Sequence, residues 1–264
     1  MSAVLFRSYF LCTTPRSGST LLCDLLAATG VAGRPESYFR KPDLPAWSKR
    51  LHVPSEPDVG LAYLSTVQEY GAAGTGLFGC RIMWESMAEL LSRLEVLDPG
   101  LPGDAARIEQ AFGPTLYVHL TRADKAAQAV SLLKALQSGL WHRNSDGTVR
   151  EGPDQPQATS YDAALIAEHF DRLSQHDGAW RAWFAESGIT PVTVGYDALI
   201  ADPQLAVAEI LSALGLDRAR ASNVKPRTAK LAEDDSLNWI ERFRAEAPQT
   251  CERRSSAPHD HDNP

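Results

Sequence analysis

The sequence predicts an α/β fold in which a central parallel sheet is flanked by helices on both faces. Short apolar runs of the kind that form buried strands alternate with longer segments that repeat apolar residues at helical spacing. The first apolar run leads into a loop rich in small hydroxyl residues, and a helix follows this loop directly. The length of 264 residues fits one large domain of this class and is enough for a substantial core.

The first strand is expected at Tyr9–Cys12, which is apolar throughout, as in parallel strands buried on both faces. A helix from Ser19 to Thr29 follows, with leucines at helical spacing and Gly30 as its stop. The stretch from Arg34 to Pro57 holds five prolines with little periodicity, which predicts a long irregular segment that often carries function. The later strands are expected at residues 77–84, 115–120 and 191–194, and the later helices at residues 59–70, 85–97, 124–137, 161–186, 202–214 and 236–244.

Two polar segments are expected to lie outside this framework. Residues 138–160 are polar and contain glycine and proline, which predicts a mobile loop. The composition turns polar again after residue 245. We therefore expect a single domain over residues 1–246 and a disordered C-terminal tail over residues 247–264.

The charge balance excludes a protein that is held on nucleic acid or on a membrane by its overall charge. The net charge is −7, from 26 basic and 33 acidic residues, so an anionic ligand needs a local basic site. No apolar run approaches the length of a membrane span, and no membrane insertion is expected. The four cysteines have neither CxxC nor zinc-site spacing, and free thiols of this kind are typical of the reducing cytoplasm.

The segment Thr-Thr-Pro-Arg-Ser-Gly-Ser-Thr joins the first strand to the first helix and has the properties of an oxyanion site. Gly18 allows the backbone to turn and approach a ligand, and Arg16 adds a fixed positive charge. Hydroxyl donors come from Ser17, Ser19 and Thr20. The first N–H groups of a helix have no partner within the helix and point at one spot. A serine-capped helix start is the simpler interpretation, but it does not explain why a cation, a glycine and three hydroxyls share one turn.

A kinase or NTPase is the first alternative for such a loop. The Walker motif, G-x-x-x-x-G-K-[ST], needs a lysine after its last glycine, whereas Ser19 follows Gly18 here and no glycine lies at the required distance before it. The third strand runs into Thr121 and Arg122 rather than into an aspartate that would hold magnesium. An arginine there suits direct binding of a phosphate. The loop therefore predicts a P-loop-like three-layer fold and a site without a metal.

Taken together, the loop Pro-Arg-Ser-Gly-Ser-Thr, the strand that ends in Arg122 and the helix that carries Ser131 resemble the sulfotransferases that use 3′-phosphoadenosine 5′-phosphosulfate (PAPS). The resemblance is closer to the bacterial family of the mycobacterial trehalose 2-sulfotransferase. The matching pieces follow in order along most of the chain: Arg16–Leu22, Ala28–Gly33, Ile82–Trp84, Arg122, Asp124, Gln128–Ser131, Trp141, Gly178–Phe184, Lys225–Pro226 and Trp239. The family also implies a homodimer.

This resemblance implies two sites for the nucleotide. The 5′-phosphosulfate would be held by residues of the first loop, which are Arg16, Ser17, Gly18, Ser19 and Thr20. Arg16 would also stabilise the charge that grows on the leaving phosphate. Arg122 and Ser131 would hold the 3′-phosphate, and a basic loop that ends at Lys230 would close over the nucleotide.

The acceptor side departs from the family pattern. The trehalose enzyme has Gly-Glu-Pro-Gln-Glu-Phe-Phe, whose second glutamate is the proposed general base, whereas this chain has Gly-Arg-Pro-Glu-Ser-Tyr-Phe. A match without gaps puts Ser37 at the base position and Arg34 at a sugar-binding acid, which argues against trehalose as the acceptor. We expect Glu36 to take the acceptor proton, because it is the only acid near the loop in this proline-rich region. The alternative is that Glu36 is a solvated loop acid that pairs with Arg34. The expected acceptor-binding residues are Arg34, Glu36, Ser37, Tyr38 and Phe39.

The predicted function is in-line transfer of a sulfuryl group from PAPS to a hydroxyl of a carbohydrate or small molecule, with release of PAP. Positioning and charge stabilisation would supply most of the catalysis. A kinase or NTPase and a non-catalytic PAP-binding module are the alternatives. Arg81, at the end of the second strand, is a further candidate for a sulfate or acceptor contact. Trp180 is expected in the core or at a dimer contact, and His119 in the core.

Overall fold

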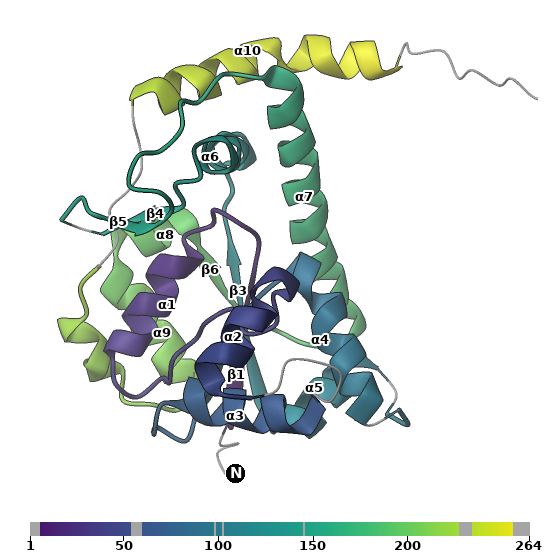
Figure 1. Cartoon of the computed structure of the whole chain (residues 1–264), viewed down its shortest axis with the longest axis vertical. Coiled ribbons are helices and arrows are strands. Elements are labelled where there is room, and N and C mark those ends of the chain that lie inside the picture. The colour runs from purple at the N-terminus through teal and green to yellow at the C-terminus, as the bar shows by residue number, and fades with distance from the viewer. Residues whose placement is uncertain are drawn as a thin grey trace, which may run out of the picture. The chain divides into compact units, whose positions relative to one another are not determined.

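The computed structural model describes residues 6–53, 60–97, 99–101, 103–144, 146–226 and 234–255. The chain divides into two compact units, Met1–Ala123 with Gln175–Thr228, and Asp124–Ser174 with Ala229–Pro264. Figure 1 shows the helices and strands that make up these units, coloured along the chain. Helix α7 (Ala163–Glu186) contributes its first part to the second unit and its last part to the first.

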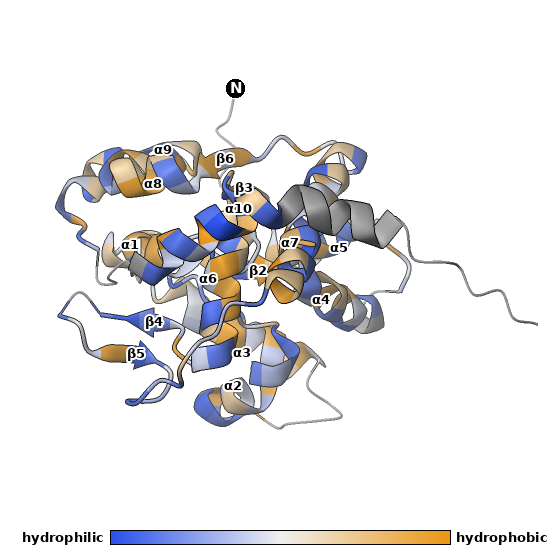
Figure 2. Ribbon diagram, turned by 90° about the horizontal axis from the view of Figure 1, so that it is seen from above, coloured by the Kyte–Doolittle hydropathy of each residue, from blue (hydrophilic) through white to orange (hydrophobic). Residues whose placement is uncertain are grey.

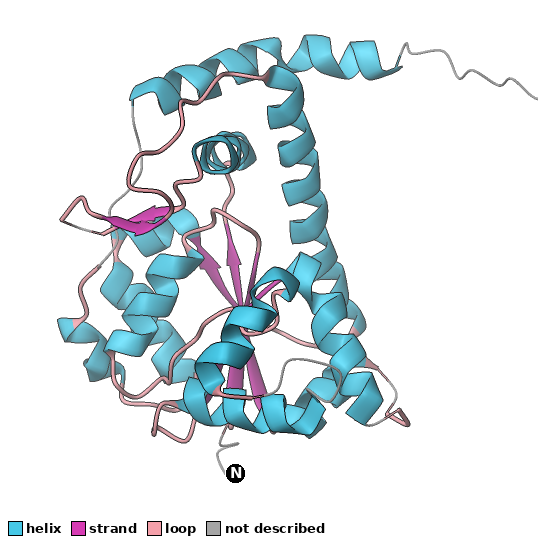
Figure 3. Cartoon of the chain, viewed as in Figure 1, coloured by secondary structure: helices cyan, strands magenta, loops and turns pink. Residues whose placement is uncertain are grey.

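The first unit is built on a four-stranded sheet in which neighbouring strands are parallel (Figure 3). Its strands are β1 (Ser8–Thr13), β2 (Phe78–Met83), β3 (Thr115–Thr121) and β6 (Val192–Gly195), in the order β2-β1-β3-β6. These are the four strands that the sequence predicts, with ends that differ by at most one residue. β2 lies on one side of β1 and β3 on the other, so the strand order switches direction at β1. Ligands of open α/β sheets bind at the carboxyl ends of the strands beside such a switch point.

The side chains of β1 alternate between the two faces of the sheet and so enter two different cores. Tyr9 and Leu11 pack with α1 (Ser19–Ala28) and α9 (Pro203–Ala213). Phe10 and Cys12 pack into a second cluster formed largely by α3 (Gly60–Ala72), α4 (Trp84–Leu97), α5 (Asp104–Phe112) and the end of α7. Figure 2 shows α1, α8 and α9 on one side of the strands and α4 and α5 on the other. This arrangement confirms the α/β, P-loop-like three-layer fold.

Three helices of this unit were not predicted from the sequence. They are α2 (Leu44–Leu51), α5 (Asp104–Phe112) and α8 (Tyr196–Ala201). The stretch from Arg34 to Pro57, expected to be irregular, contains a 3₁₀ turn (Lys41–Asp43) followed by α2. Prolines stand in the first turn of both elements, where the missing N–H group would have no helical partner. The predicted helices at residues 59–70 and 85–97 correspond to α3 (Gly60–Ala72) and α4 (Trp84–Leu97).

The second unit contains α6 (Lys125–Ser138), β4 (His142–Arg143), β5 (Val149–Glu151), the first part of α7 and α10 (Asp234–Ser255). Its core joins apolar residues of α6, α7 and α10, among them Val130, Ile166 and Phe243. β4 and β5 form an antiparallel hairpin within residues 138–160, where the sequence predicted a loop without regular structure. Helix α10 continues to Ser255, past the domain end predicted at residue 246, and residues 256–264 lie outside the described residues.

Candidate functional site

The loop after β1 takes a conformation that few residue types adopt. Arg16 and Gly18 both have left-handed backbones, with φ of 60° and 87°. A left-handed arginine is uncommon, and such strain concentrates at functional sites. Helix α1 begins at Ser19, and no side chain caps it. The positive end of the α1 dipole and the first N–H groups of α1 therefore lie at the end of this loop. Anion sites in proteins have this arrangement.

Buried hydrogen bonds fix the base of this loop. The Thr13 hydroxyl donates to Leu120 O at 2.7 Å, and so the Ser17 hydroxyl, 2.6 Å away, is the donor to Thr13. Trp180 Nε1 donates to Thr13 O at 2.9 Å. Trp180 is fully buried, as predicted, and its bond to the loop is a role that the sequence did not reveal. The proton of the Ser17 hydroxyl is therefore used inside the protein, and in this arrangement the hydroxyl is not free to donate to an anionic ligand.

Arg122 approaches the same loop from the end of β3. Its Nη1 donates to Arg16 O at 3.2 Å, and its guanidinium carbon lies 4.2 Å from the centre of the Tyr196 ring. Tyr196, at the start of α8, also lies against Gly18, where an added Cβ would come within 2.9 Å of the ring. The structure therefore brings together the predicted Arg122 and the first loop. Tyr196 was missed because no sequence motif marks it.

The predicted acceptor segment runs beside the edge strand β2. Glu36 forms a parallel bridge with Cys80, and Arg81 N–H donates to Glu36 O at 3.0 Å. The Arg81 side chain then makes two further bonds, from Nε to Ser37 Oγ at 2.8 Å and from Nη1 to Thr20 Oγ1 at 2.9 Å. A single guanidinium thus links the first turn of α1 to the acceptor segment. These contacts join Ser37 to the predicted phosphate loop (residues 13–20), and the role of Glu36 as base stays a prediction.

Tyr38 and Phe39 are core residues in this structure. Their side chains are 0% and 1% exposed, and they pack in the aromatic cluster on the α2 and α3 side of the sheet. Burial raises the pKa of Tyr38 far above its usual value, so this phenol stays protonated. Arg34 is exposed, with its guanidinium carbon 4.7 Å from the centre of the Tyr70 ring.

His119 and Asp177 form a buried polar pair below the carboxyl end of β3. His119 Nε2 lies 3.3 Å from Asp177 Oδ1, and the Thr121 hydroxyl donates to the same oxygen at 2.8 Å. His119 is buried, as predicted. The pair ties β3 to α7, the helix that also holds Thr13 through Trp180.

The other two predicted ligands of the 3′-phosphate, Ser131 and Lys230, are not among the described residues of the first unit. Ser131 lies on α6 in the second unit and is half-buried. Lys230 lies outside the described residues. Across the residues that the structure describes, no group of three or more His, Cys, Asp or Glu side chains is placed to hold a metal ion, and no helix is long and apolar enough to cross a membrane.

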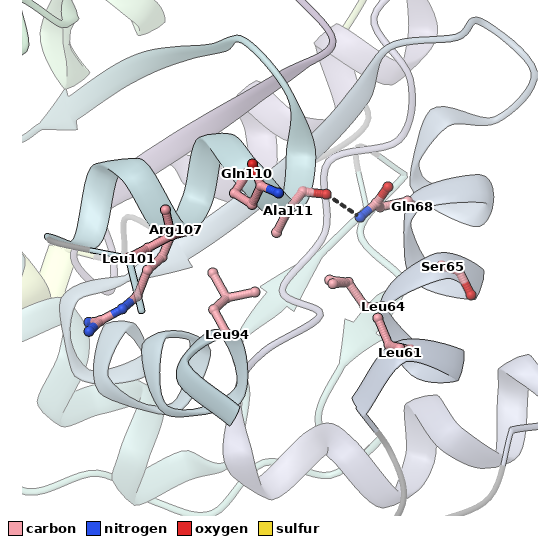
Figure 4. A pocket seen from close by; sticks show the side chains of 9 residues that line it. All are labelled: Leu61, Leu64, Ser65, Gln68, Leu94, Leu101, Arg107, Gln110 and Ala111. Carbon is pink, nitrogen blue, oxygen red and sulfur yellow. Dashed lines mark hydrogen bonds between the residues drawn. The ribbon is translucent and has the colours of Figure 1, made fainter. Parts of the chain in front are cut away.

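A pocket of about 300 Å³ lies elsewhere in the first unit (Figure 4). It is lined by residues of α3, α4, α5 and the connection before α5: Leu61, Leu64, Ser65, Gln68, Leu94, Leu101, Arg107, Gln110 and Ala111. Gln68 Nε2 donates to Ala111 O across its wall at 2.9 Å. It shares no residue with the phosphate loop or the acceptor segment, and so it is distinct from the candidate site.

Known proteins show which family this chain belongs to. The sequence model of the Stf0 sulphotransferase family matches residues 8–246. A trehalose 2-sulfotransferase of Mycobacterium tuberculosis is 33% identical over 92% of this chain and 96% of its own length. A trehalose 2-sulfotransferase of Mycolicibacterium smegmatis is 30% identical over 91% of this chain and 95% of its own length.

Among solved structures, a sulfotransferase from Alicyclobacillus acidocaldarius has a TM-score of 0.46 at 14% identity, covering 91% of this chain and 94% of that one. Sulfotransferase STF9 from Mycobacterium avium has a TM-score of 0.45 at 13% identity, covering 94% of this chain and 77% of that one.

Proposed function

Because the chain belongs to the Stf0 sulphotransferase family and is an enzyme that transfers a sulfuryl group, we propose that its donor is PAPS. The approach of Arg122 to the phosphate loop carries this proposal, since it adds a fixed cation beside a helix N-terminus that has no Walker lysine. The 5′-phosphosulfate would lie on the loop from Arg16 to Thr20. Arg122, Ser131 and Lys230 would bind the 3′-phosphate side of the nucleotide.

The reaction would be an in-line displacement at sulfur. A bond forms between the acceptor oxygen and sulfur while the bond from sulfur to the 5′-phosphate oxygen breaks, and PAP leaves with the electron pair. Glu36 would take the proton of the acceptor hydroxyl. Arg16 and the first N–H groups of α1 would stabilise the charge on the leaving phosphate, without a metal ion.

Arg81 has the position of a residue that contacts the transferring group itself. Its guanidinium is half-buried and is held by the hydroxyls of Thr20 and Ser37, one from the donor side and one from the acceptor side. Both partners are neutral, so its charge is not cancelled by them. The sulfuryl group, as it is transferred from the donor to the acceptor, would be an anionic partner for the Arg81 guanidinium.

The acceptor would be a hydroxyl on a carbohydrate or a similar small molecule. The relatives at 30–33% identity are trehalose 2-sulfotransferases, which supports a carbohydrate. Arg34 and Ser37 stand where that family has acids, which disfavours trehalose itself. A homodimer and a cytoplasmic location remain predictions from the sequence.

PAP binding tests the choice of donor. We expect PAP to stabilise the protein by about 2.7 kcal/mol at about 100 times its dissociation constant, a rise of several degrees in melting temperature. Because arginines and backbone groups replace a metal, the rise should be the same in EDTA. Differential scanning fluorimetry with PAP, ATP and ATP plus magnesium gives the result. A shift with ATP and magnesium but none with PAP would contradict the proposal.

Replacing Glu36 by Gln tests the base. The amide cannot accept the proton, so turnover should fall by about 10² to 10⁴, while PAP affinity stays unchanged. Steady-state release of PAP measures turnover, and Glu109→Gln, which removes an exposed acid of α5, is the control. Full activity of Glu36→Gln would show that another group takes the proton.

A further inference from the structure

A cluster of three aromatic side chains lies beside the acceptor segment. The rings of Tyr38 and Trp47 have centres 4.9 Å apart, and the Tyr70 ring lies 5.8 Å from Trp47 and 6.3 Å from Tyr38. The cluster is attached to the acceptor segment, because Trp47 Nε1 donates to Ser37 O at 3.0 Å. Contacts therefore run without a gap from the phosphate loop through Arg81 and Ser37 to these rings.

Two arginines converge on this cluster from different elements. The guanidinium carbon of Arg34 lies 4.7 Å from the centre of the Tyr70 ring. That of Arg50, at the end of α2, lies 5.1 Å from the same ring and 5.0 Å from Trp47. Neither arginine has an ion pair in the part of the chain that the structure describes. Two like charges share one aromatic ring, in a protein whose net charge is −7.

The hydrogen-bonding state of Tyr70 adds an independent observation. Its hydroxyl oxygen is buried, and among the described residues the O–H group has no acceptor. The Tyr70 hydroxyl is the largest cause of a raised pKa of Arg34, and nearby Glu36 adds to it and outweighs the lowering by burial, so Arg34 keeps its charge. Two guanidinium groups and an O–H donor without an acceptor are the donor set that an oxyanion prefers.

We infer that the acceptor carries an oxyanionic group, a carboxylate, phosphate or sulfate, in addition to the hydroxyl that is sulfonated, and that Arg34 and Arg50 bind this group. The inference rests on the proposed function. The acceptor would lie along the Ser37 segment, with its hydroxyl toward Arg81 and Thr20 and its anionic group on the aromatic cluster. Binding of the anion would relieve the repulsion between the two guanidinium groups and provide an acceptor for the Tyr70 hydroxyl.

The charge of the product tests this inference whichever molecule serves as the acceptor. Isotope-labelled PAPS is incubated with the enzyme and a metabolite extract, and labelled products are separated by anion exchange beside free sulfate and PAPS standards. A neutral acceptor gives a sulfate ester with one negative charge, whereas an anionic acceptor gives two or more. We expect the label in products with two or more charges. Label in singly charged esters alone would overturn the inference and leave the sulfotransferase function intact. Absence of label from every ester would overturn both.

Variants then locate the anionic group on the enzyme. With the labelled acceptor, Arg34→Gln and Arg50→Gln should each raise KM by about 10- to 100-fold at little-changed kcat, because each removes a charged hydrogen-bond donor. Arg40→Gln is the matched control, since Arg40 is an exposed arginine of the same segment that is paired with Asp43 at 2.8 Å. PAP-induced melting shifts verify that each variant folds and binds nucleotide. If both variants behave like Arg40→Gln, the arginines only cover the aromatic rings, and the inference is wrong.

Purified sugars of matched shape give a second readout. Initial rates of PAP release are compared for glucose, glucuronic acid and glucose 6-phosphate at low and high ionic strength. The anionic sugars should be preferred by wild type at low salt, and the preference should shrink at high salt because the arginines are exposed. Equal rates for neutral and anionic sugars, unchanged by salt, would contradict the inference.

Discussion

Replacing Gly18 by Ala is expected to lower PAP affinity and turnover by about 100-fold. The backbone at Gly18 has a φ of 87°, which costs an alanine about 1–2 kcal/mol. The added Cβ would also lie 2.9 Å from Tyr196 Cδ2, so the ring must move. Because Arg122 stacks on that ring and holds Arg16 O, the movement displaces a proposed 3′-phosphate ligand and the loop together.

Gly30→Ala separates backbone strain from this contact. Gly30, which follows the last residues of α1, has a similar φ of 71°, and a Cβ added there meets nothing within 4 Å. Both variants should lose similar stability from the backbone, measured as the midpoint of urea unfolding. The loss of PAP binding, measured by calorimetry, should appear in Gly18→Ala alone. Normal PAP binding by Gly18→Ala would refute the proposed role of the contacts among Gly18, Tyr196 and Arg122 in nucleotide binding.

Replacing Arg81 by Gln is expected to lower kcat by about 10² to 10³, the usual cost of removing one donor that stabilises a transition state. The proposed partner of Arg81 is the sulfuryl group, which PAP lacks. Affinity for PAP should therefore change little, while the rate of sulfuryl transfer falls. Single-turnover kinetics with PAPS, together with calorimetry of PAP binding, separate the two effects.

Two further variants show whether the charge or its geometry matters. Arg81→Lys keeps the charge but cannot donate to Thr20 and Ser37 in the same fork geometry, so an intermediate loss is expected. Arg93→Gln removes an arginine of α4 that pairs with Glu89 at 2.7 Å, and it should leave turnover unchanged. If Arg81→Gln weakens PAP binding as much as it lowers turnover, the residue acts by positioning Thr20 and not on the sulfuryl group.

The sequence predicted all four strands of the parallel sheet and the strand-loop-helix turn after the first of them. Buried parallel strands are short apolar runs, and a glycine followed by a leucine-rich helix marks the turn, so both signals are local. Helices α2, α5 and α8 and the hairpin of β4 and β5 were missed. Each of them is short, and helices of this length depend on tertiary packing more than on their own propensity.

The candidate site was predicted in part. Arg122 was expected to hold the 3′-phosphate, which stays a prediction, and the structure shows that its side chain donates to Arg16 O in the first loop. Tyr196, Trp180 and the bridging bonds of Arg81 follow no motif, since each contact joins residues that are far apart in the sequence. Of the predicted acceptor residues, Tyr38 and Phe39 lie in the core. Arg34 is exposed, and its guanidinium lies over the ring of Tyr70.

The sequence by itself determined that a strand, a glycine-containing loop and a helix start follow one another, because these signals are local, and it predicts an oxyanion site there. Only the tertiary structure decided which side chains surround that site. Thr20, Ser37 and Arg81 come from three separate segments, and their meeting depends on the strand order and on the packing of the acceptor segment against β2. Local propensities do not encode such contacts, since the direction of each side chain is fixed by the core beneath it.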